Sequence, residues 1–405
     1  MKVLMINSVC GIKSTGRICT DLAEILEKNG HTCKIAYGRE AVPAKYEKHA
    51  HKIGGSLNTK LHGLKARLFD AAGFGSKAET RKLVKWIKDY DPDVIHLHNL
   101  HGYYINVNIL FDYLKKAGKP VVWTLHDCWP FTGHCSYFNA ANCYKWKTQC
   151  NNCPQKKAYP SSLLFDRSRS NYEIKKRLFT SLDSLVLITP SEWLAHMVRS
   201  SFFENKEVVA IPNGVDLGVF RPIDSDFLKK YDLLDKKVVL GVATSWSERK
   251  GLKIFAEISQ KLPSDYKVVL VGVTAEAAKD LPENILVIPK TNNVEELAQI
   301  YTAADVLLNP STQETMGLTT VEAMACGTPA AVSNLTAVPE VIDENGGIVL
   351  DDLSAETIIK GIESVLGREY PNTRATAEKY EKEQQYLKYI AIYEKLLFGE
   401  NNENS

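Results

Sequence analysis

The sequence predicts an α/β protein made of two doubly wound domains, each with a parallel sheet covered by helices on both faces. Apolar runs of strand length alternate with segments of helical period almost throughout the 405 residues, which is the pattern of strand–helix–strand units. The alternation occurs in two series, separated by a segment at 212–222 that contains glycine and proline and suits a linker. A chain of this length can form two domains with separate cores.

The first series opens with a buried strand at 2–8, followed by a helix at 15–30 that ends at Gly30. We expect this domain to span 1–205. Its further parallel strands are expected at 33–38, 93–98, 120–127, 184–194 and 207–216.

The second series gives a second domain at 206–375, and the remaining segment, 376–405, reads as a final helix. Tyrosines and aliphatic residues recur there at near-helical spacing, so we expect this helix to pack back on the first domain. The strands of the second domain are expected at 237–243, 267–273, 284–289, 305–310, 329–333 and 347–351.

Composition excludes several classes of protein. The hydrophobic content of 44% and charged content of 24% are ordinary for a globular protein. A net charge of +2 argues against a nucleic-acid partner. No stretch approaches the roughly 20 apolar residues that span a bilayer, and the N-terminus does not resemble a signal peptide. We therefore expect a cytoplasmic protein whose nine cysteines are thiols or metal ligands.

Ligands of open parallel sheets bind beyond the carboxyl ends of the strands, so polar residues that follow strands are the candidate site. After the first strand, Gly11 and Gly16 flank a loop that opens a helix. Such a loop lets backbone N–H groups approach an anion. Arg17 is a cation at a helix start, which is locally unfavourable unless a phosphate or carboxylate lies nearby. Glycine is also common in any such turn, and the spacing is not G-x-G-x-x-G.

Histidines follow two other strands of the first domain. His96, His98 and His101 end one strand, where polar packing at a cleft edge is a better interpretation than a metal site. His126 ends the next strand and is followed by Asp127. An imidazole at this position can hydrogen-bond a substrate hydroxyl or stabilise developing charge, so His126 is a candidate catalytic residue. The alternative is a structural histidine bonded to a loop carbonyl.

In the second domain, Arg249 and Lys250 precede Gly251 at a helix start after the first strand. Two cations at the N-terminus of a helix are locally unfavourable. They are explained if a polyanion such as a diphosphate leaving group lies between them. An exposed basic turn is the alternative.

The segment "NPSTQETMGLTTVEAMACGTP" at 309–329 follows another strand of this domain. Gly317 begins a helix, with Leu318 and Thr319 in its first turn, so free backbone N–H groups can bind the same diphosphate. Glu314 precedes the helix and Glu322 lies within it. Their carboxylates flank the anion site and can accept hydrogen bonds from sugar and ribose hydroxyls. A sugar nucleotide has hydroxyls at both ends and a diphosphate between them.

Together these motifs resemble the retaining glycosyltransferases of family 4, which have the GT-B fold of two Rossmann-like domains facing across a cleft. The resemblance rests on the two spaced glutamates and on the "RKG", "PNGVD" and "LHD" segments, and it covers nearly the whole chain. Within the family it is greatest to bacterial exopolysaccharide and capsule transferases. Those enzymes carry segments similar to "HLHNLHGYY", "WTLHDCWPFTGHC" and "CYKWKTQCNNCP" of this chain.

The resemblance implies transfer of a hexosyl group from a UDP- or GDP-type donor, without a catalytic metal, to a glycan or undecaprenyl-linked acceptor. Two positions depart from the family pattern: Ser245 stands where many members have arginine, and Thr-Met-Gly follows Glu314. The roles it implies are donor-sugar contact for Glu314, ribose contact for Glu322, diphosphate contact for Arg249 and Lys250, sugar contact near the reacting carbon for His126, and approach to the phosphates for Gly16.

Residues 128–160 form a Cys- and Trp-rich insertion after a strand. Cys135, Cys143, Cys150 and Cys153 lie close together in sequence, and the last two form a C-x-x-C pair. We expect them to bind a structural zinc ion that stiffens the loop beside His126. A redox pair and free buried thiols are the alternatives.

The basic segment at 43–76 contains Lys60, Lys65 and Arg67 between leucines and a phenylalanine. It can lie on an anionic membrane surface, which would place the protein at the inner face of the membrane, or it can be a solvated helix covering the first domain.

Three other functions are weaker interpretations. Another GT-B enzyme, such as a sugar-nucleotide epimerase or a phosphorylase, needs further acid and base groups or a pyridoxal-type lysine that no motif supplies. A zinc-stapled, non-enzymatic scaffold that binds nucleic acid conflicts with the near-neutral charge. A glycosidase needs two carboxylates on opposite sides of a sugar bond, whereas Glu314 and Glu322 belong to one loop–helix unit.

Overall fold

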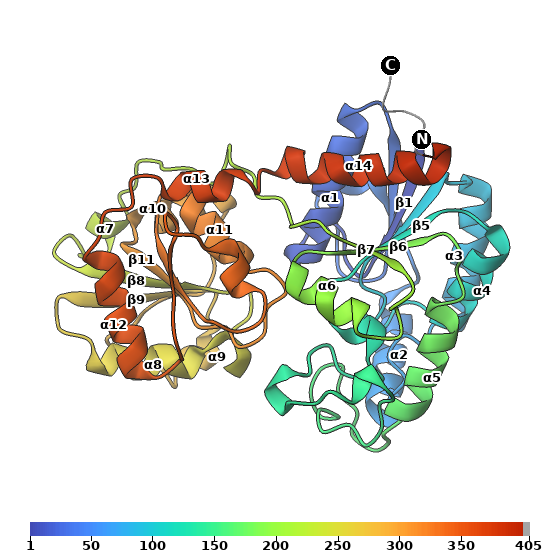
Figure 1. Cartoon of the computed structure of the whole chain (residues 1–405), viewed down its shortest axis with the longest axis horizontal. Coiled ribbons are helices and arrows are strands. Elements are labelled where there is room, and N and C mark those ends of the chain that lie inside the picture. Colours follow the sequence, from blue (N-terminus) through green and yellow to red (C-terminus); the bar gives the residue numbers. More distant parts are fainter. Residues whose placement is uncertain (400–405) are drawn as a thin grey trace. The chain divides into compact units, whose positions relative to one another are not determined.

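The structure is a computed structural model of the whole chain and describes residues 1–399. These residues form two compact units (Figure 1). The first comprises Met1–Pro212 together with the chain from Gln385 onward, and the second comprises Asn213–Gln384. Part of the predicted final segment, 400–405, lies outside the described residues.

The first unit is built on a seven-stranded parallel sheet in the order β3-β2-β1-β4-β5-β6-β7. The order reverses between β1 and β4, and the carboxyl ends of these two strands define the switch point at which ligands of doubly wound sheets bind. The strands are β1 (Lys2–Asn7), β2 (Thr32–Tyr37), β3 (Ala50–Lys52), β4 (Val94–Leu97), β5 (Val121–Thr124), β6 (Leu185–Thr189) and β7 (Glu207–Ala210).

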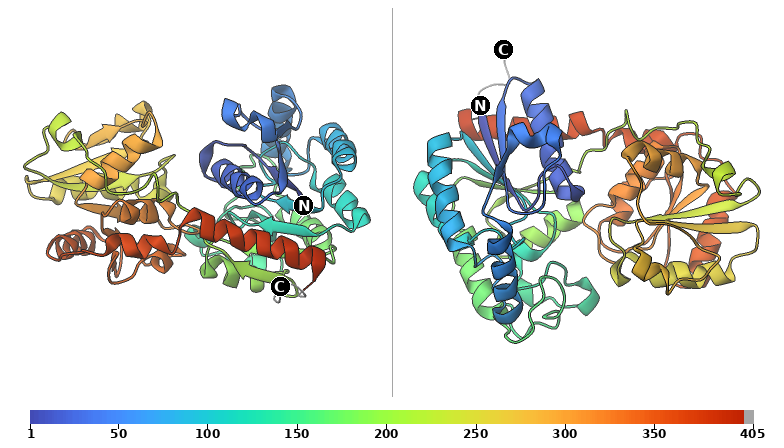
Figure 2. Two further views of the ribbon diagram at one scale, coloured as in Figure 1. Left: turned by 90° about the horizontal axis from the view of Figure 1, so that it is seen from above. Right: turned by 180° about the vertical axis from the view of Figure 1, so that it is seen from behind.

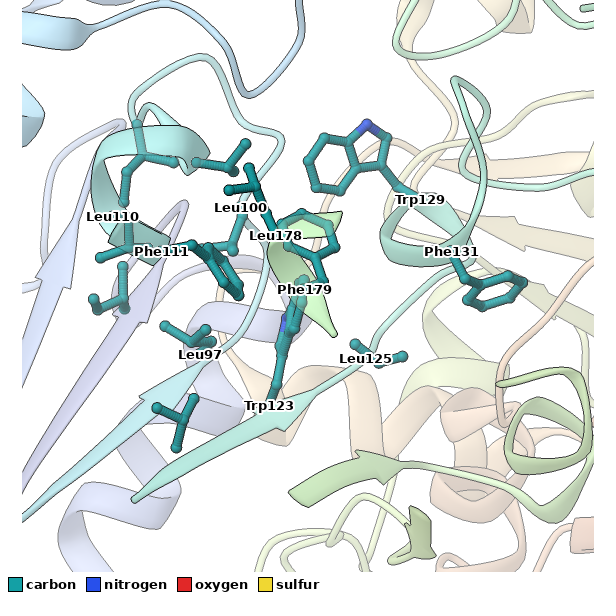
Figure 3. Close-up of a cluster of buried hydrophobic side chains, with 14 of the residues drawn as sticks. Leu97, Leu100, Leu110, Phe111, Trp123, Leu125, Trp129, Phe131, Leu178 and Phe179 are labelled. Carbon is teal, nitrogen blue, oxygen red and sulfur yellow. The ribbon is translucent and has the colours of Figure 1, made fainter. Parts of the chain in front are cut away.

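Both faces of this sheet are covered, because successive side chains of a strand point to opposite faces. In β1, Val3 and Met5 pack on one face, and Leu4 and Ile6 pack on the other. The second face is rich in aromatic residues around Trp123 and Phe179 (Figure 3). The helices of the unit are α1 (Lys13–Lys28), α2 (Ser56–Phe69), α3 (Lys77–Tyr90), α4 (Val107–Ala117), α5 (Ser168–Phe179), α6 (Glu192–Arg199) and α14 (Lys382–Phe398).

Helix α14 packs on the same face of the first sheet as α1 (Figures 1 and 2). It buries Tyr386, Tyr389, Ile390 and Tyr393, and the Tyr393 hydroxyl lies 2.6 Å from Nδ1 of His96 in β4. Leu387, which belongs to the sequence pattern, is exposed instead.

The second unit contains a six-stranded parallel sheet in the order β10-β9-β8-β11-β12-β13, which repeats the topology of the first sheet without an additional edge strand. Its switch point lies between β8 and β11. The strands are β8 (Lys237–Val242), β9 (Tyr266–Val271), β10 (Leu286–Ile288), β11 (Val306–Asn309), β12 (Ala330–Val332) and β13 (Gly347–Val349).

Helices cover both faces of this second sheet as well. Clusters around Leu240 and Val239, which are neighbours in β8, fill the two faces. The helices are α7 (Phe227–Lys230), α8 (Leu252–Lys261), α9 (Ala275–Ala278), α10 (Val294–Ala303), α11 (Leu318–Ala325), α12 (Ala355–Leu366) and α13 (Thr373–Glu378).

The structure differs from the sequence prediction in two details of the first sheet. Strand β3 was not expected, because its three residues are polar or small and lie at the sheet edge, where an apolar run is not required. The first unit extends to Pro212 instead of 205, since β7 pairs with β6 in the first sheet. Within residues 1–399, no helix combines the length and apolarity needed to cross a bilayer.

Candidate functional site

The two loops that follow β8 and β11 meet at the switch point of the second sheet. The loop after β8 ends in a short 3-10 turn, Glu248–Lys250, and then passes through Gly251 in the left-handed region at φ +77°. A Cβ atom at Gly251 would lie 2.6 Å from the Pro310 ring of the other loop. Glycine is therefore required both by the backbone conformation and by the close approach of the two loops.

Hydrogen bonds and an ion pair join the basic loop to the acidic loop. The Thr312 N–H donates to the Arg249 carbonyl at 2.9 Å, and Arg249 Nη1 donates to the Gln313 carbonyl at 2.7 Å. The Lys250 ammonium forms an ion pair with Oε1 of Glu314, and both side chains are largely buried, with 17% and 14% exposed. The structure thus brings Arg249, Lys250 and Glu314 together, although Glu314 is distant from the two cations in sequence.

The N-terminus of α11 lies at the end of the acidic loop. Gly317 precedes the helix at φ +99°, and among the described residues no side chain caps the helix and no acidic residue occupies its first turn. Unpaired N–H groups and the helix dipole make such a terminus suited to an anion. Thr319 of this first turn and Lys250 line the same small pocket, together with Trp246 and Asn309.

Glu322 lies in α11, as predicted, and has a partner that the sequence did not suggest. Its Oε2 accepts a hydrogen bond from the Tyr301 hydroxyl at 2.9 Å. Tyr301 belongs to α10, which packs next to α11 in the same core cluster. The bond fixes the position of the Glu322 carboxylate, and the ribose contact expected for this residue remains a prediction.

Gly16 and Arg17 lie within α1, which begins at Lys13. Gly16 is buried, and a Cβ atom there would lie 3.1 Å from Val9 and 3.2 Å from the Gly11 nitrogen. The structure therefore gives Gly16 a packing role, in which it lets the loop after β1 fold against the helix. Its approach to phosphates remains a prediction. Arg17 is exposed.

His126 follows β5 and lies against a second histidine. Its Nε2 is 3.0 Å from Nδ1 of His98, which follows β4 in the neighbouring strand. Burial lowers the pKa of His126 to about 4, although the Asp127 carboxylate acts in the opposite direction. The imidazole of His126 is therefore neutral at neutral pH, and it can take part in hydrogen bonds but does not carry a positive charge.

A buried His–Asp pair beside His126 was missed in the sequence. Nε2 of His101 lies 2.8 Å from Oδ2 of Asp127, and Nδ1 lies 3.2 Å from the Tyr159 hydroxyl. Burial raises the pKa of Asp127, but the His101 charge and the hydrogen bonds from His101 and Trp129 outweigh it and hold the pKa below its usual range. The sequence could have predicted this pair, because His101 and Asp127 follow adjacent parallel strands whose carboxyl ends meet.

Acidification is expected to destabilise the first unit. Burial lowers the pKa of His62 to about 4, of His96 to about 3, of His126 to about 4, and of His98 well below 6.5. Between pH 6.5 and about 4 the unfolded chain binds protons at these histidines that the folded chain does not bind, so stability falls as pH falls. His134 acts in the opposite direction, because Asp70 raises its pKa.

Thermal unfolding followed by circular dichroism between pH 7.5 and 4.5 tests this prediction. The melting temperature of the first unit should fall through this range, and the His62→Gln variant should show a shallower dependence. A melting temperature that is constant or rises on acidification would show that these histidines are protonated in the folded state.

The structure does not show the zinc site predicted at the four cysteines. Within residues 1–399, no group of three or more His, Cys, Asp or Glu side chains is arranged to hold a metal ion. The Cys135 thiol hydrogen-bonds Cys153, and this bond lowers the pKa of Cys153 to about 7. Cys135 and Cys150 are buried, whereas Cys143 and Cys153 are partly exposed.

Polar and aromatic interactions hold the Cys-rich insertion in the structure. The buried ammonium of Lys175 donates to the carbonyls of Trp129 and Thr132, at 2.8 and 3.0 Å, and lies 3.4 Å from the centroid of the Trp129 ring. His134 and Asp70 form a buried pair at 2.6 Å. These polar anchors and an aromatic cluster around Trp146 hold the insertion against the rest of the unit.

Two doubly wound parallel sheets of the same topology, with a basic and an acidic loop meeting at a switch point, define the GT-B class of glycosyltransferase. Family comparisons agree with this assignment. Residues 15–219 match the family model described as Glycosyltransferase Family 4, and residues 225–384 match Glycosyl transferases group 1. The chain belongs to glycosyltransferase family 4, which confirms the family and the fold predicted from the sequence.

Curated relatives of this chain are themselves named as glycosyltransferases. A protein of Escherichia coli named as a colanic acid biosynthesis glycosyl transferase is 24% identical over 368 residues, which are 86% of each chain. A D-inositol 3-phosphate glycosyltransferase of Segniliparus rotundus is 28% identical over 208 residues, 47% of this chain and 46% of the relative.

Solved structures share the fold over almost the whole chain. Sucrose-phosphate synthase of Thermosynechococcus elongatus has a TM-score of 0.72 at 18% identity and covers 98% of both chains. The HepE protein of Anabaena, solved in complex with UDP-glucose, has a TM-score of 0.66 at 16% identity over 96% of this chain and 99% of its own.

Proposed function

We propose that this chain transfers a hexosyl group from a UDP- or GDP-type sugar nucleotide to a glycan or undecaprenyl-linked acceptor, with retention of configuration, in the synthesis of a surface polysaccharide. The observation that carries this proposal is the junction of the two loops at the β8/β11 switch point. It combines two cations, a helix N-terminus and a carboxylate within one small region of the second unit.

The ion pair between Lys250 and Glu314 suits a ligand in which a phosphate adjoins a sugar. An ammonium group has three N–H donors, and Lys250 uses one of them for Glu314. Its remaining donors can bind a phosphate oxygen, while Oε2 of Glu314 can accept a hydrogen bond from a sugar hydroxyl. The bond to be broken joins the anomeric carbon to the phosphate oxygen, and it would lie between these two contacts.

Charge development favours the same arrangement. As the glycosidic bond breaks, its electron pair leaves with the diphosphate, whose negative charge grows. Lys250, Arg249 and the N-terminus of α11 are preorganised donors for that charge. The acceptor hydroxyl oxygen forms the new bond to the anomeric carbon, and its proton must pass to a base such as the departing diphosphate.

The donor is tested by thermal-shift measurements with nucleoside diphosphates and sugar nucleotides. A ligand at 100 times its dissociation constant should stabilise the protein by about 2.7 kcal/mol. The solved complexes of HepE contain UDP or UDP-glucose, so uridine compounds are the first to test. Product analysis by nuclear magnetic resonance then gives the anomeric configuration. Inversion would contradict the retaining mechanism, and no shift with any sugar nucleotide would contradict the proposed donor.

Lys250→Ala and Arg249→Ala should each weaken nucleoside diphosphate binding more than nucleoside binding. Each variant loses a charge-assisted contact to phosphate, worth about 1.5–3 kcal/mol. Lys250→Ala also leaves the Glu314 carboxylate unpaired and close to the phosphates. Calorimetry with a nucleoside diphosphate and with the corresponding nucleoside measures the difference.

Lys253→Ala is the matched control, because Lys253 lies in the first turn of α8 and its side chain is 83% exposed. Its nucleoside diphosphate binding should be unchanged. An equal loss for nucleoside and diphosphate in the Arg249 and Lys250 variants would place both cations away from the phosphates.

A further inference from the structure

Helix α2 exposes three of its four leucines, and its buried residues are His62 and Ala66. Leu57, Leu61 and Leu64 are 69%, 59% and 56% exposed, whereas His62 and Ala66 face the interior. A helix on the surface of a globular protein normally has the opposite arrangement, with the apolar stripe toward the core. The reversed orientation leaves an apolar stripe that nothing in the described residues covers.

A second exposed apolar segment lies beside the end of this helix. Leu163, Leu164 and Phe165, which follow the Cys-rich insertion, are 62%, 63% and 51% exposed. The Leu163 N–H donates to the carbonyl of Arg67 at 2.7 Å, and the rings of Phe165 and Phe69 stack with centroids 5.5 Å apart. Figure 1 shows α2 alongside the insertion. We name α2 and residues 163–165 together the leucine patch.

Cations border the leucine patch. At about 100° per residue, the leucines at 57, 61, 64 and 68 of α2 form one narrow stripe, with Lys65 on one side and Lys60 and Arg67 on the other. Helix α2 contains no acidic residue. Residues 154–169 add Lys156, Lys157, Arg167 and Arg169 against a single acid, Asp166.

We propose that the leucine patch docks this protein on the surface of an anionic lipid bilayer. An interfacial helix inserts its apolar face at the boundary of headgroups and acyl chains, while flanking lysine and arginine side chains bind lipid phosphates. The 14 residues of α2 span about 21 Å and suit a helix that lies in the interface. The whole chain carries only +2, so the attraction is local to this surface.

The inference deepens the proposed function, because a bilayer is where an undecaprenyl-linked acceptor is found, but its test requires no transfer activity. The full chain is sedimented with vesicles of phosphatidylglycerol and phosphatidylcholine in equal amounts, and with vesicles of phosphatidylcholine alone. We expect strong binding to the first and weak binding to the second. Salt should weaken the binding, since part of it is electrostatic.

Two sets of variants test the patch. Lys60→Glu with Lys65→Glu should weaken binding on the order of 25-fold or more, since each basic residue near the surface contributes about a fivefold effect. Leu61→Gln with Leu64→Gln should weaken binding at least about tenfold. All four side chains are at the surface, so melting temperatures should stay near that of the parent protein.

Matched controls change the same residue types elsewhere. Lys85→Glu with Lys88→Glu alters two exposed lysines of α3, and Leu234→Gln alters a leucine that is 73% exposed in the second unit. Both controls should bind vesicles like the parent protein. The membrane proposal is overturned if the controls lose as much binding as the patch variants or if neutral vesicles bind equally well. It is also overturned if sedimentation velocity shows that the patch leucines instead join two copies of the chain.

The outcome is separable from that of the proposed function. Vesicle binding without any response to sugar nucleotides would leave the leucine patch intact as a membrane site and refute the donor. Normal transfer to a water-soluble acceptor analogue without vesicle binding would refute the membrane site alone.

Discussion

Replacing Glu314 by alanine should reduce transfer about 10- to 160-fold while nucleoside diphosphate binding stays intact or tightens. A charge-assisted hydrogen bond to the reacting sugar is worth about 1.5–3 kcal/mol, and each 1.36 kcal/mol is tenfold in rate. Nucleoside diphosphate binding should not fall, because the loss of Glu314 frees the Lys250 ammonium, its partner in the unliganded protein. A donor-saturated rate assay and calorimetry on the same preparation measure both quantities.

Two comparisons make this result specific to Glu314. Glu314→Gln keeps the shape of the side chain and one acceptor oxygen but removes the charge that pairs with Lys250, so it separates loss of the charge from loss of the acceptor. Glu363→Ala removes an exposed carboxylate from α12 of the same unit and should leave kcat unchanged. A Glu314→Ala enzyme with nearly parental activity would remove this residue from the site.

Replacing His126 by alanine should lower kcat far more than it raises the donor KM. The resemblance to family 4 implies that this imidazole contacts the donor sugar near the reacting carbon, and such a contact tightens as charge develops there. The depressed pKa of about 4 keeps His126 neutral, so its contribution is a hydrogen bond or a dipole instead of a charge. The rate should therefore show no loss that tracks His126 protonation between pH 6 and 8.

A purely structural role for His126 gives a different result. If His126 has only a packing role through its contact with His98, the alanine variant should lose melting temperature, and activity should fall only with the folded fraction. His62→Ala is the control, because His62 is buried with a pKa of about 4 but is hydrogen-bonded to Ser76 in another part of the unit. A stable His126→Ala enzyme with unchanged kcat would leave the first unit without an identified catalytic residue.

The contacts of His96 and His98 show what a position at the end of a strand can and cannot predict. The two histidines are two positions apart in sequence, so they point to the same face of the strand, and their ring centroids lie 4.1 Å apart. Their functions differ because of contacts that come from distant parts of the chain. His96 binds Tyr393 of α14 and belongs to the core, while His98 contacts His126 at the carboxyl edge.

The zinc site predicted at the four cysteines is not shown by the structure and stays a prediction. Cysteine spacing shows that four thiols are near each other in sequence, but it does not show the direction in which each thiol points. The structure turns Cys135 toward Cys153 and secures the insertion through Lys175 and the Asp70–His134 pair. Both anchors join the insertion to residues far outside it, so no local pattern could have predicted them.

The sequence alone determined the two parallel-sheet domains, most of their strands, the family, and which loops follow the carboxyl ends of strands. These properties depend on hydrophobic periodicity and on short motifs, which are local and can be read along the chain. Only the tertiary structure decided which residues meet. Strand order brings Lys250 to Glu314 across 64 positions and His101 to Asp127 across 26, and packing turned the leucines of α2 outward. Periodicity identifies an apolar stripe on a helix. Whether that stripe faces the core or the solvent depends on which other elements of the fold pack against the helix.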